Sequence, residues 1–391
     1  MSKLIPPHGG KLTPVLVPME QRAECLAEAK TLPVIRMSSR ETSDLLMIGM
    51  GAFSPLTGFM GREDYKSVVA TKHLVNGLAW PIPITISVIR EQAGDLKEGM
   101  KVALVDDEID AYVGIMTVRE KYENDKEKEC KEVFFTNDPN HPGVQKVMEQ
   151  GEVNVGGPVI TFSQMGYASK YGKYYATPEQ TRALFDERGW ATVAAFQTRN
   201  PLHRSHEFLC KIGNEVCDGL LIHPIVGKLK PGDIPAEVRL KCYEVLLNNY
   251  FNPNNCLMRV YPMEMRYAGP SEGILHAIFR QNFGCSHLLV GRDHAGVGSY
   301  YTPYQAQELF DQFKPGEILL QPIKVTSAFY CRRCQGMTTE KTCPHDESDQ
   351  LNISGTKLRA MLNAGELPPG EFSRPEVLKI LMEYYQSLSI K

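Results

Sequence analysis

The sequence predicts an α/β protein built around a sheet of parallel strands. Short β-like runs separated by Gly and Pro fill residues 1–168. Apolar runs alternate with helical stretches over 169–327, and this alternation predicts strand–helix–strand crossovers. Residues 328–391 combine clustered cysteines with two helix starts. We therefore expect a mixed, mostly β N-terminal domain, a Rossmann-like doubly wound central domain and a small C-terminal α/β domain.

The N-terminal runs have the composition of strands. Residues 82–89, 101–106 and 112–118 are rich in Ile, Val and Thr and are bounded by turn-forming residues. Between them and the central domain, residues 121–132 alternate charges of both signs. Such a pattern is typical of a solvated surface segment, so we assign it no function.

The central domain begins with a sequence pattern typical of a helix N-terminus. Thr177 is a candidate N-cap, Pro178 suits the first helical position, and Gln180 completes a capping box, so a helix is predicted up to Arg188. Four buried-looking runs follow, separated by helical stretches, and each is a candidate parallel strand. These runs are 191–196, 219–226, 256–261 and 287–290.

Composition and charge exclude several classes of protein. The 391 residues are 42% hydrophobic and 23% charged, which is ordinary for a globular chain with real cores. A net charge of −3 provides no global attraction for nucleic acid or anionic membrane. Pro6 and Pro7 interrupt the place of a signal peptide, and the apolar stretch 78–89 is shorter than the roughly 20 residues of a membrane helix. We expect a cytoplasmic protein with no membrane or nucleic-acid partner.

The strongest chemical signal follows the first central strand. An apolar run ends in the polar turn 197–200, and Pro201 is expected to start a helix. His203 and His206, three residues apart, would project from one face near the positive end of that helix, where phosphate is favoured. Either histidine alone would be an ordinary helix residue. The polar residues around the pair favour a ligand-binding site.

Several stretches carry a resemblance to a known family. His-x-x-His after a strand resembles the nucleotidylyl-transferase superfamily, and the string 197–206 resembles its ATP-sulfurylase branch in particular. Further similar stretches cover essentially the whole chain, including one in an N-terminal domain of PUA-like type. They are 53–60, 265–272, 291–298 and 353–359. In the superfamily the turn that begins at Ser354 closes over the phosphates, which implies a supporting role.

The resemblance implies a sulfate adenylyltransferase, in which sulfate attacks the α-phosphate of ATP in line and releases diphosphate. Its sulfate site maps to Gln197, Arg199 and the backbone of Ala295. A planar guanidinium suits this role because it donates two parallel hydrogen bonds to an oxyanion. The implied catalytic residues are Thr198, Arg199, Asn200, His203, His206 and Arg292. The implied nucleotide contacts are Gln197, Thr198, Arg199, Asn200, His203, His206, Gly291, Arg292, Asp293 and His294.

A metal site is expected in the C-terminal domain. Cys331, Cys334, Cys343 and His345 form the pattern C-x2-C-x8-C-x-H, which suits a closed tetrahedral zinc site of structural type. Unrelated reduced cysteines in a loop are the alternative, and His345 is the least certain ligand. Mg²⁺ is expected to arrive with ATP and to need no protein cage of its own.

Other functions are compatible with parts of the pattern. Another His-x-x-His adenylyltransferase, acting on a cofactor precursor, is the nearest alternative, and the Arg-Asp-His turn at 292–294 argues against it. A PUA-type barrel and a zinc knuckle also occur in RNA-binding modules, but no basic aromatic strip accompanies them. A phosphate loop of the Gly-x4-Gly-Lys type is missing from the sequence, so no kinase activity is expected. The expected partners are ATP, sulfate, adenylylsulfate (APS), diphosphate and a second copy of the chain in a homodimer.

Overall fold

The N-terminal sheet is mixed, as predicted. The computed structural model describes residues 2–230, 232–351, 353 and 355–389. In it β1 runs parallel to β4, the other pairings are antiparallel, and the order is β1-β4-β5-β7-β2 with β3 and β6 also paired to β7. The strands are β1 (Val34–Met37), β2 (Gly58–Phe59), β3 (Ser87–Val88), β4 (Lys101–Asp106), β5 (Ala111–Thr117), β6 (Glu120–Glu123) and β7 (Val153–Thr161).

Short helices cover this sheet, and one of them corrects a prediction. They are η1 (Met19–Gln21), α1 (Arg22–Ala29), α2 (Ser39–Gly49), α3 (Arg62–Thr71), α4 (Arg90–Asp95), α5 (Lys126–Phe134) and α6 (Pro142–Met148). The segment 121–132 lies mostly at the surface, as predicted, but it is not solvated throughout. Lys121 Nζ donates to two backbone carbonyls, and Glu129 is only 4% exposed because α5 packs on α3 and α6. Burial raises the pKa of Glu129 to about 7.

The central sheet is parallel throughout, in the order β10-β9-β8-β11-β12. Its strands are β8 (Val193–Thr198), β9 (Gly219–Pro224), β10 (Cys256–Met258), β11 (His287–Val290) and β12 (Gln321–Lys324). The associated helices are α7 (Tyr167–Tyr171), η2 (Gly172–Tyr174), α8 (Pro178–Glu187), α9 (Arg204–Val216), α10 (Ala236–Tyr250), α11 (Pro270–Asn282) and α12 (Gln305–Phe310). Helix α8 starts with the predicted capping box, in which Thr177 and Gln180 bond reciprocally.

Helix α9 begins later than predicted. Pro201 was expected to start it, but the first helical residue is Arg204, and His203 has the extended backbone of an N-cap. The preceding turn is held by the Asn200 carbonyl, which accepts hydrogen bonds from Thr198 Oγ1 at 2.9 Å and Tyr243 Oη at 2.7 Å. A carbonyl fixed by two hydroxyls keeps the chain out of the helix for three more residues.

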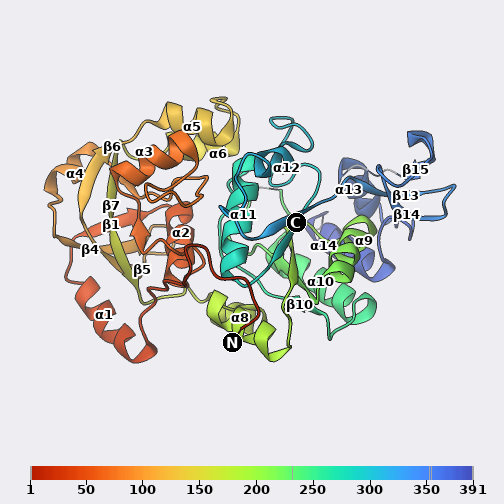
Figure 1. Ribbon diagram of the computed structural model, residues 1–391, viewed down its shortest axis with the longest axis horizontal. Coiled ribbons are helices and arrows are strands. Elements are labelled where there is room, and N and C mark those ends of the chain that lie inside the picture. Colours follow the sequence, from red (N-terminus) through yellow and green to blue (C-terminus); the bar gives the residue numbers. More distant parts are fainter. Residues whose placement is uncertain (1, 231, 352, 354, 390–391) are drawn as a thin grey trace.

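Helix α2 lies between the N-terminal and central sheets, beside α11 (Figure 1). It starts with a capping box between Ser38 and Glu41. On its buried face Asp44 pairs with Arg266 through contacts of 2.7 and 2.6 Å, and both side chains are at most 3% exposed. The Glu264 amide donates to Ser43 Oγ at 3.0 Å. A buried polar seam therefore joins residues far apart in the sequence.

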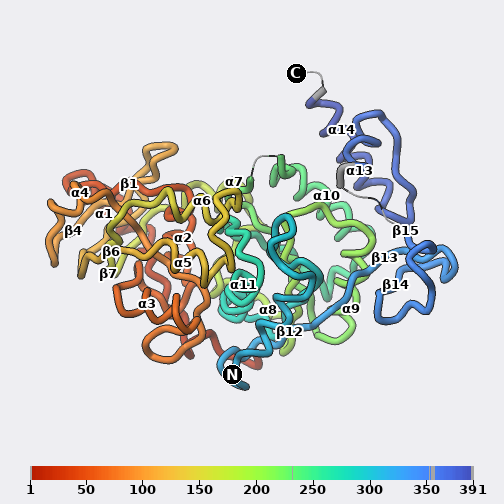
Figure 2. The backbone as a smooth tube through the Cα atoms, turned by 90° about the horizontal axis from the view of Figure 1, so that it is seen from above, coloured from red at the N-terminus to blue at the C-terminus, as the bar shows by residue number. Residues whose placement is uncertain are grey.

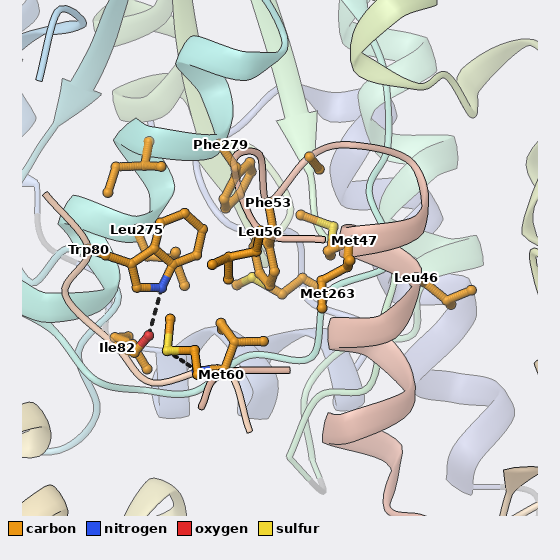
Figure 3. Close-up of a cluster of buried hydrophobic side chains, with 14 of the residues drawn as sticks. Leu46, Met47, Phe53, Leu56, Met60, Trp80, Ile82, Met263, Leu275 and Phe279 are labelled. Carbon is orange, nitrogen blue, oxygen red and sulfur yellow. Dashed lines mark hydrogen bonds between the residues drawn. The ribbon is translucent and has the colours of Figure 1, made fainter. Parts of the chain in front are cut away.

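The hydrophobic core crosses the same boundary (Figure 3). Phe53 packs edge-on against Trp80, with ring centroids 5.8 Å apart, and tilted against Phe279 of α11 at 6.3 Å. Met263 and Leu275 of the central part complete this cluster. Near the chain start, the His8 amide donates to Asn282 Oδ1 at 2.8 Å. The two parts share one core.

The C-terminal part lies at the end of the molecule far from the N-terminal sheet (Figure 2). It contains an antiparallel sheet in the order β14-β13-β15, and its helix α14 packs on α10. Its elements are β13 (Ala328–Cys331), β14 (Gly336–Thr339), η3 (Glu347–Asp349), β15 (Gln350–Leu351), α13 (Gly355–Asn363) and α14 (Pro375–Ser389). Ser354, the expected phosphate-side cap, lies outside the described residues. No helix in the described ranges is long and apolar enough to cross a membrane.

We predict that Asp44→Asn destabilises the folded chain by about 3 kcal/mol, because Arg266 would remain buried without its counter-charge. Urea unfolding of the variant and the parent measures this. Asp107→Asn is the control, since Asp107 pairs with Arg36 on the surface, where both side chains are more than half exposed. Equal unfolding midpoints for Asp44→Asn and Asp107→Asn would contradict a stabilising role for the buried seam.

Candidate active site

A cavity of about 530 Å³ opens at the carboxyl ends of the central strands. The end of β8 and the turn after it line one wall with Gln197, Thr198, Arg199 and Asn200, and the turn after β11 lines the other with residues 291–296. Open parallel sheets bind ligands at this edge. The structure thus brings together the two motifs that the sequence placed about ninety residues apart.

Arg199 links the two turns. Its Nη2 donates to the carbonyl of Gly296 at 3.0 Å, and its guanidinium carbon lies 5.2 Å from the ring centre of Tyr267. Thr198 Oγ1 accepts the Asn200 amide at 3.1 Å, which tightens the turn. Gln197 Nε2 is buried without a hydrogen-bond partner in the described part of the chain.

The turn after β11 has an unusual backbone. Asp293 and Ala295 adopt left-handed φ angles of 52° and 57°, conformations that non-glycine residues rarely hold. Their turn is fixed because the Asp293 amide donates to the Pro303 carbonyl at 2.8 Å and the Gly296 amide to the Asp293 carbonyl at 3.1 Å. Arg292 is exposed and pairs with Asp293 at 3.2 Å. His294 Nε2 lies 3.2 Å from Nδ1 of the buried His276.

The two predicted histidines lie at the start of α9, with ring centroids 5.8 Å apart. Burial, with a smaller effect of His206, lowers the pKa of His203 to about 3, and burial lowers the pKa of His206 to about 4. Both rings are therefore neutral at pH 7. His206 Nδ1 accepts the His203 amide at 3.2 Å, so its single proton resides on Nε2. His206 presents a neutral N–H donor at this position.

A second cavity of about 410 Å³ adjoins the first. Both are lined by Asn200, Ser205, His206 and Ala328, so His206 stands where they meet. His203 lines only the second cavity, whose outer wall comes from the C-terminal part. The histidine pair therefore faces two adjacent cavities.

The lining of the first cavity favours anions. Arg199, Lys230 and Arg292 contribute positive charge, whereas Asp293 is the single carboxylate among its described lining residues. The start of α9 adds the positive end of a helix dipole. A locally cationic site thus exists in a chain whose net charge is −3.

Sequence reasoning missed three residues of this site. Lys230 and Tyr301 line the first cavity, and the ring of Tyr267 packs against the Arg199 guanidinium. Lys228 and Lys230 follow β9, whose carboxyl end meets the same edge of the sheet, so their position was a usable signal. Tyr267 lies in the stretch 265–272 that carries the family resemblance, but its contact with Arg199 depends on tertiary packing.

The predicted metal ligands come together in the C-terminal part. Cys331, Cys334, Cys343 and His345 each offer a ligand atom, and these atoms all lie within 4.8 Å of one another. Nδ1 of His345 is 3.4, 3.2 and 3.8 Å from the sulfurs of Cys331, Cys334 and Cys343 in turn. This Cys3His group can hold a metal ion.

The fold and the site together define an α/β nucleotidyltransferase: a parallel sheet, a cationic cavity at its carboxyl edge and paired imidazoles at a helix start. Family comparisons agree with this class. Residues 172–384 match the ATP-sulfurylase family, and residues 5–164 match a PUA-like domain. The chain belongs to the ATP-sulfurylase family and is an enzyme of the nucleotidyltransferase class.

Similar proteins extend over the whole chain. A sulfate adenylyltransferase of Desulforamulus reducens is 70% identical over 98% of this chain and 99% of its own length. One of Pelodictyon phaeoclathratiforme is 55% identical over 99% of this chain and 97% of its own. A solved structure, a hexameric APS kinase from Thiobacillus denitrificans, is 27% identical with a TM-score of 0.75 and covers 97% of this chain and 68% of that chain.

We predict that His203 and His206 remain neutral down to about pH 5. Their folded pKa values lie below the unfolded value of about 6.5, so the unfolded chain binds protons more readily and stability falls as pH drops from about 6.5 toward 4. Histidine ¹⁵N NMR of the folded protein measures the protonation, and the urea-unfolded chain is the reference. A ring that titrates near pH 6.5 in the folded protein would contradict this environment.

Proposed function

We propose that this chain joins sulfate to the α-phosphate of ATP, forming adenylylsulfate and releasing diphosphate. The observation that carries the proposal is the cavity in which the turns after β8 and β11 face one another, with Arg199 bonded across the gap to Gly296. The sulfate adenylyltransferases that share 55–70% of its residues support the same reaction.

Sulfate binds in this proposal between Gln197, Arg199 and the backbone of Ala295. The Arg199 guanidinium keeps donors beyond its single bond to Gly296, because the group has five N–H bonds. Gln197 lines the same cavity, and a side-chain amide is a hydrogen-bond donor for an anion. All three residues line the same cavity, which allows one small oxyanion to contact them together.

ATP lies across the two cavities, with its α-phosphate near His206. The proposed nucleotide contacts are Gln197, Thr198, Arg199, Asn200, His203, His206, Gly291, Arg292, Asp293 and His294. Thr198 and Asn200 act mainly by shaping the turn, since Thr198 Oγ1 is already bonded within it. Arg292 is half exposed and bonds to Asp293 through Nε only, so its remaining N–H donors can meet the charge of the leaving diphosphate.

The chemistry requires positioning and charge stabilisation. A sulfate oxygen forms a bond to the α-phosphorus while the bond from that phosphorus to the bridging oxygen of the diphosphate breaks. No proton moves, so no general base is needed. The neutral His206 ring donates a hydrogen bond from Nε2 to an oxygen of the transition state, while Arg199 and Arg292 supply positive charge. No residue becomes covalently attached.

Two metals complete the proposal. Mg²⁺ bound to ATP neutralises charge on the β- and γ-phosphates and takes no dedicated protein ligand. Zinc suits the Cys3His group: tetrahedral zinc requires about 3.8 Å between sulfurs and about 3.6 Å between sulfur and nitrogen. Cys334 and Cys343 sulfurs are 3.9 Å apart, and sulfur–nitrogen separations are 3.2–3.8 Å. Four protein ligands leave no open position, so its role is structural.

The chain also belongs, in this proposal, to a homo-oligomer of the cytoplasm, with a homodimer as the smallest form. The hexameric solved relative supports self-assembly. A thiolate-rich metal site supports a reducing compartment, because disulfide formation among Cys331, Cys334 and Cys343 would remove its ligands.

We predict that Arg199→Ala abolishes sulfate-dependent diphosphate release from MgATP, with a loss of about 100-fold or more in kcat/KM for sulfate. The loss follows because the guanidinium supplies both sulfate binding and positive charge. Coupled diphosphate detection with and without sulfate measures it. Arg62→Ala, at an exposed arginine of α3, is the control. If the parent protein released diphosphate at the same rate with and without sulfate, the proposed reaction would be overturned.

We predict that the protein as purified contains about one zinc per chain and that Cys334→Ser loses it, because three ligands hold the ion far less tightly than four. Metal analysis by mass spectrometry after gel filtration measures the content. Cys25→Ser tests a half-buried cysteine outside the cluster and should keep the metal. Equal zinc in both variants would place the ion elsewhere.

A further inference from the structure

A short segment of the C-terminal part, Gly370–Arg374, lies over the first turn of α9. The carbonyl of Phe372 accepts the amide of Arg204, the first helical residue, at 3.1 Å. The Phe372 ring lies 4.5 Å from the His203 ring, centroid to centroid. Arg204 Nη1 also donates to the Gly370 carbonyl at 3.3 Å. The segment thus caps a helix end whose N-cap is one of the paired histidines.

An ion pair fixes this segment to the helix. Arg374 donates from Nε and Nη2 to the two carboxylate oxygens of Glu207, both at 2.8 Å. The Glu207 side chain is 5% exposed and that of Arg374 is 23% exposed. Burial raises the pKa of the Glu207 carboxyl, but bonds from Arg374 and Lys211 outweigh it and leave the pKa below the ordinary value. The pair is charged, bidentate and largely shielded from water.

The arginine has a second anchor. Its guanidinium carbon lies 3.9 Å from the ring centre of Tyr250, the last residue of α10. The Tyr250 hydroxyl lies 3.0 Å from both carboxylate oxygens of Glu376 in α14. Arg374 is therefore held between α9, α10 and the start of α14, in a position that a flexible surface residue does not keep.

These contacts act on the histidine pair. The backbone amide of His203 donates to His206 Nδ1, so the backbone at His203 helps to orient the His206 ring. Phe372 packs against the His203 ring, and Arg374 forms an ion pair with Glu207, the residue that follows His206. A shift of the segment would move both imidazoles relative to the cavities that they line.

We propose that Phe372 and Arg374 are positioning residues for the adenylyl transfer: they clamp the first turn of α9 so that His203 and His206 meet the α-phosphate in a fixed orientation. This inference rests on the proposed function. The proposed sulfate contacts at Gln197, Arg199 and Ala295 lie at the end of β8 and on the turns after β8 and β11, outside the helix turn that the clamp holds. Its loss therefore affects turnover and ATP while sulfate binding stays unchanged.

Arg374→Gln, Arg374→Lys and Phe372→Leu test the clamp in the full-length protein. We expect kcat to fall about 10- to 100-fold in Arg374→Gln, as for a displacement of reacting groups by about 1 Å, with the KM for sulfate unchanged. Arg374→Lys keeps the positive charge but cannot form two parallel hydrogen bonds with the carboxylate, so its kcat should lie between those of Arg374→Gln and the parent. Arg36→Gln, which breaks a surface pair with Asp107 and Asp110, is the matched control and should match the parent.

Two further measurements separate positioning from folding. Thermal unfolding should show every variant folded at the assay temperature, although Arg374→Gln lowers the midpoint because Glu207 keeps only Lys211 as a counter-charge. Histidine ¹⁵N–¹H NMR should show the His203 ring signals shifted in Phe372→Leu because the ring current of Phe372 is lost. Unchanged kcat in folded Arg374→Gln and Phe372→Leu would overturn the clamp, as would a kcat loss that Arg36→Gln shares. An inactive parent would refute the proposed reaction instead, and unmoved His203 signals in Phe372→Leu would then refute the contact itself.

Discussion

The buried pair of Asp44 and Arg266 joins residues 222 positions apart and anchors a loop that contacts the active site. Its effect passes along a short loop. Glu272 accepts the amides of Arg266 and Ala268 at 3.0 and 3.1 Å, which shapes the loop before α11. Tyr267 lies between Arg266 and Ala268 in the sequence, and its ring packs against the guanidinium of Arg199. A helix of the N-terminal part therefore supports the cavity without lining it, and the polar seam has a functional reason to be buried.

Burial also decides what the histidines can do. A charged imidazole beside a phosphate would attract it, but the pair is neutral because its surroundings exclude water. Positive charge comes instead from Arg199 and Arg292, which line the first cavity. In the proposed reaction the site separates two tasks: guanidinium groups supply charge, and an imidazole with a fixed tautomer supplies a directed hydrogen bond.

Local features of the sequence were sufficient for much of the fold. The capping box at Thr177, the parallel strands and the meeting of the turns after β8 and β11 all follow from short patterns. What failed depended on tertiary contacts. The start of α9 moved to Arg204 because Tyr243, from another helix, holds the Asn200 carbonyl. Glu129 is buried by helix packing, and neither the Tyr267 contact with Arg199 nor the clamp on α9 has a local signature.

Phe53, Trp80 and Phe279 belong to one hydrophobic core that the N-terminal and central parts share. The two parts therefore differ from independent domains, which each have a core of their own. Modular domains recombine during evolution because each buries its own apolar surface. Here a separated N-terminal part would expose aromatic rings and leave an acid without its partner, and the catalytic part would expose the matching surface. The N-terminal and catalytic parts are thus bound to be inherited together, and new functions would be added at the periphery of the pair instead of by exchanging either part.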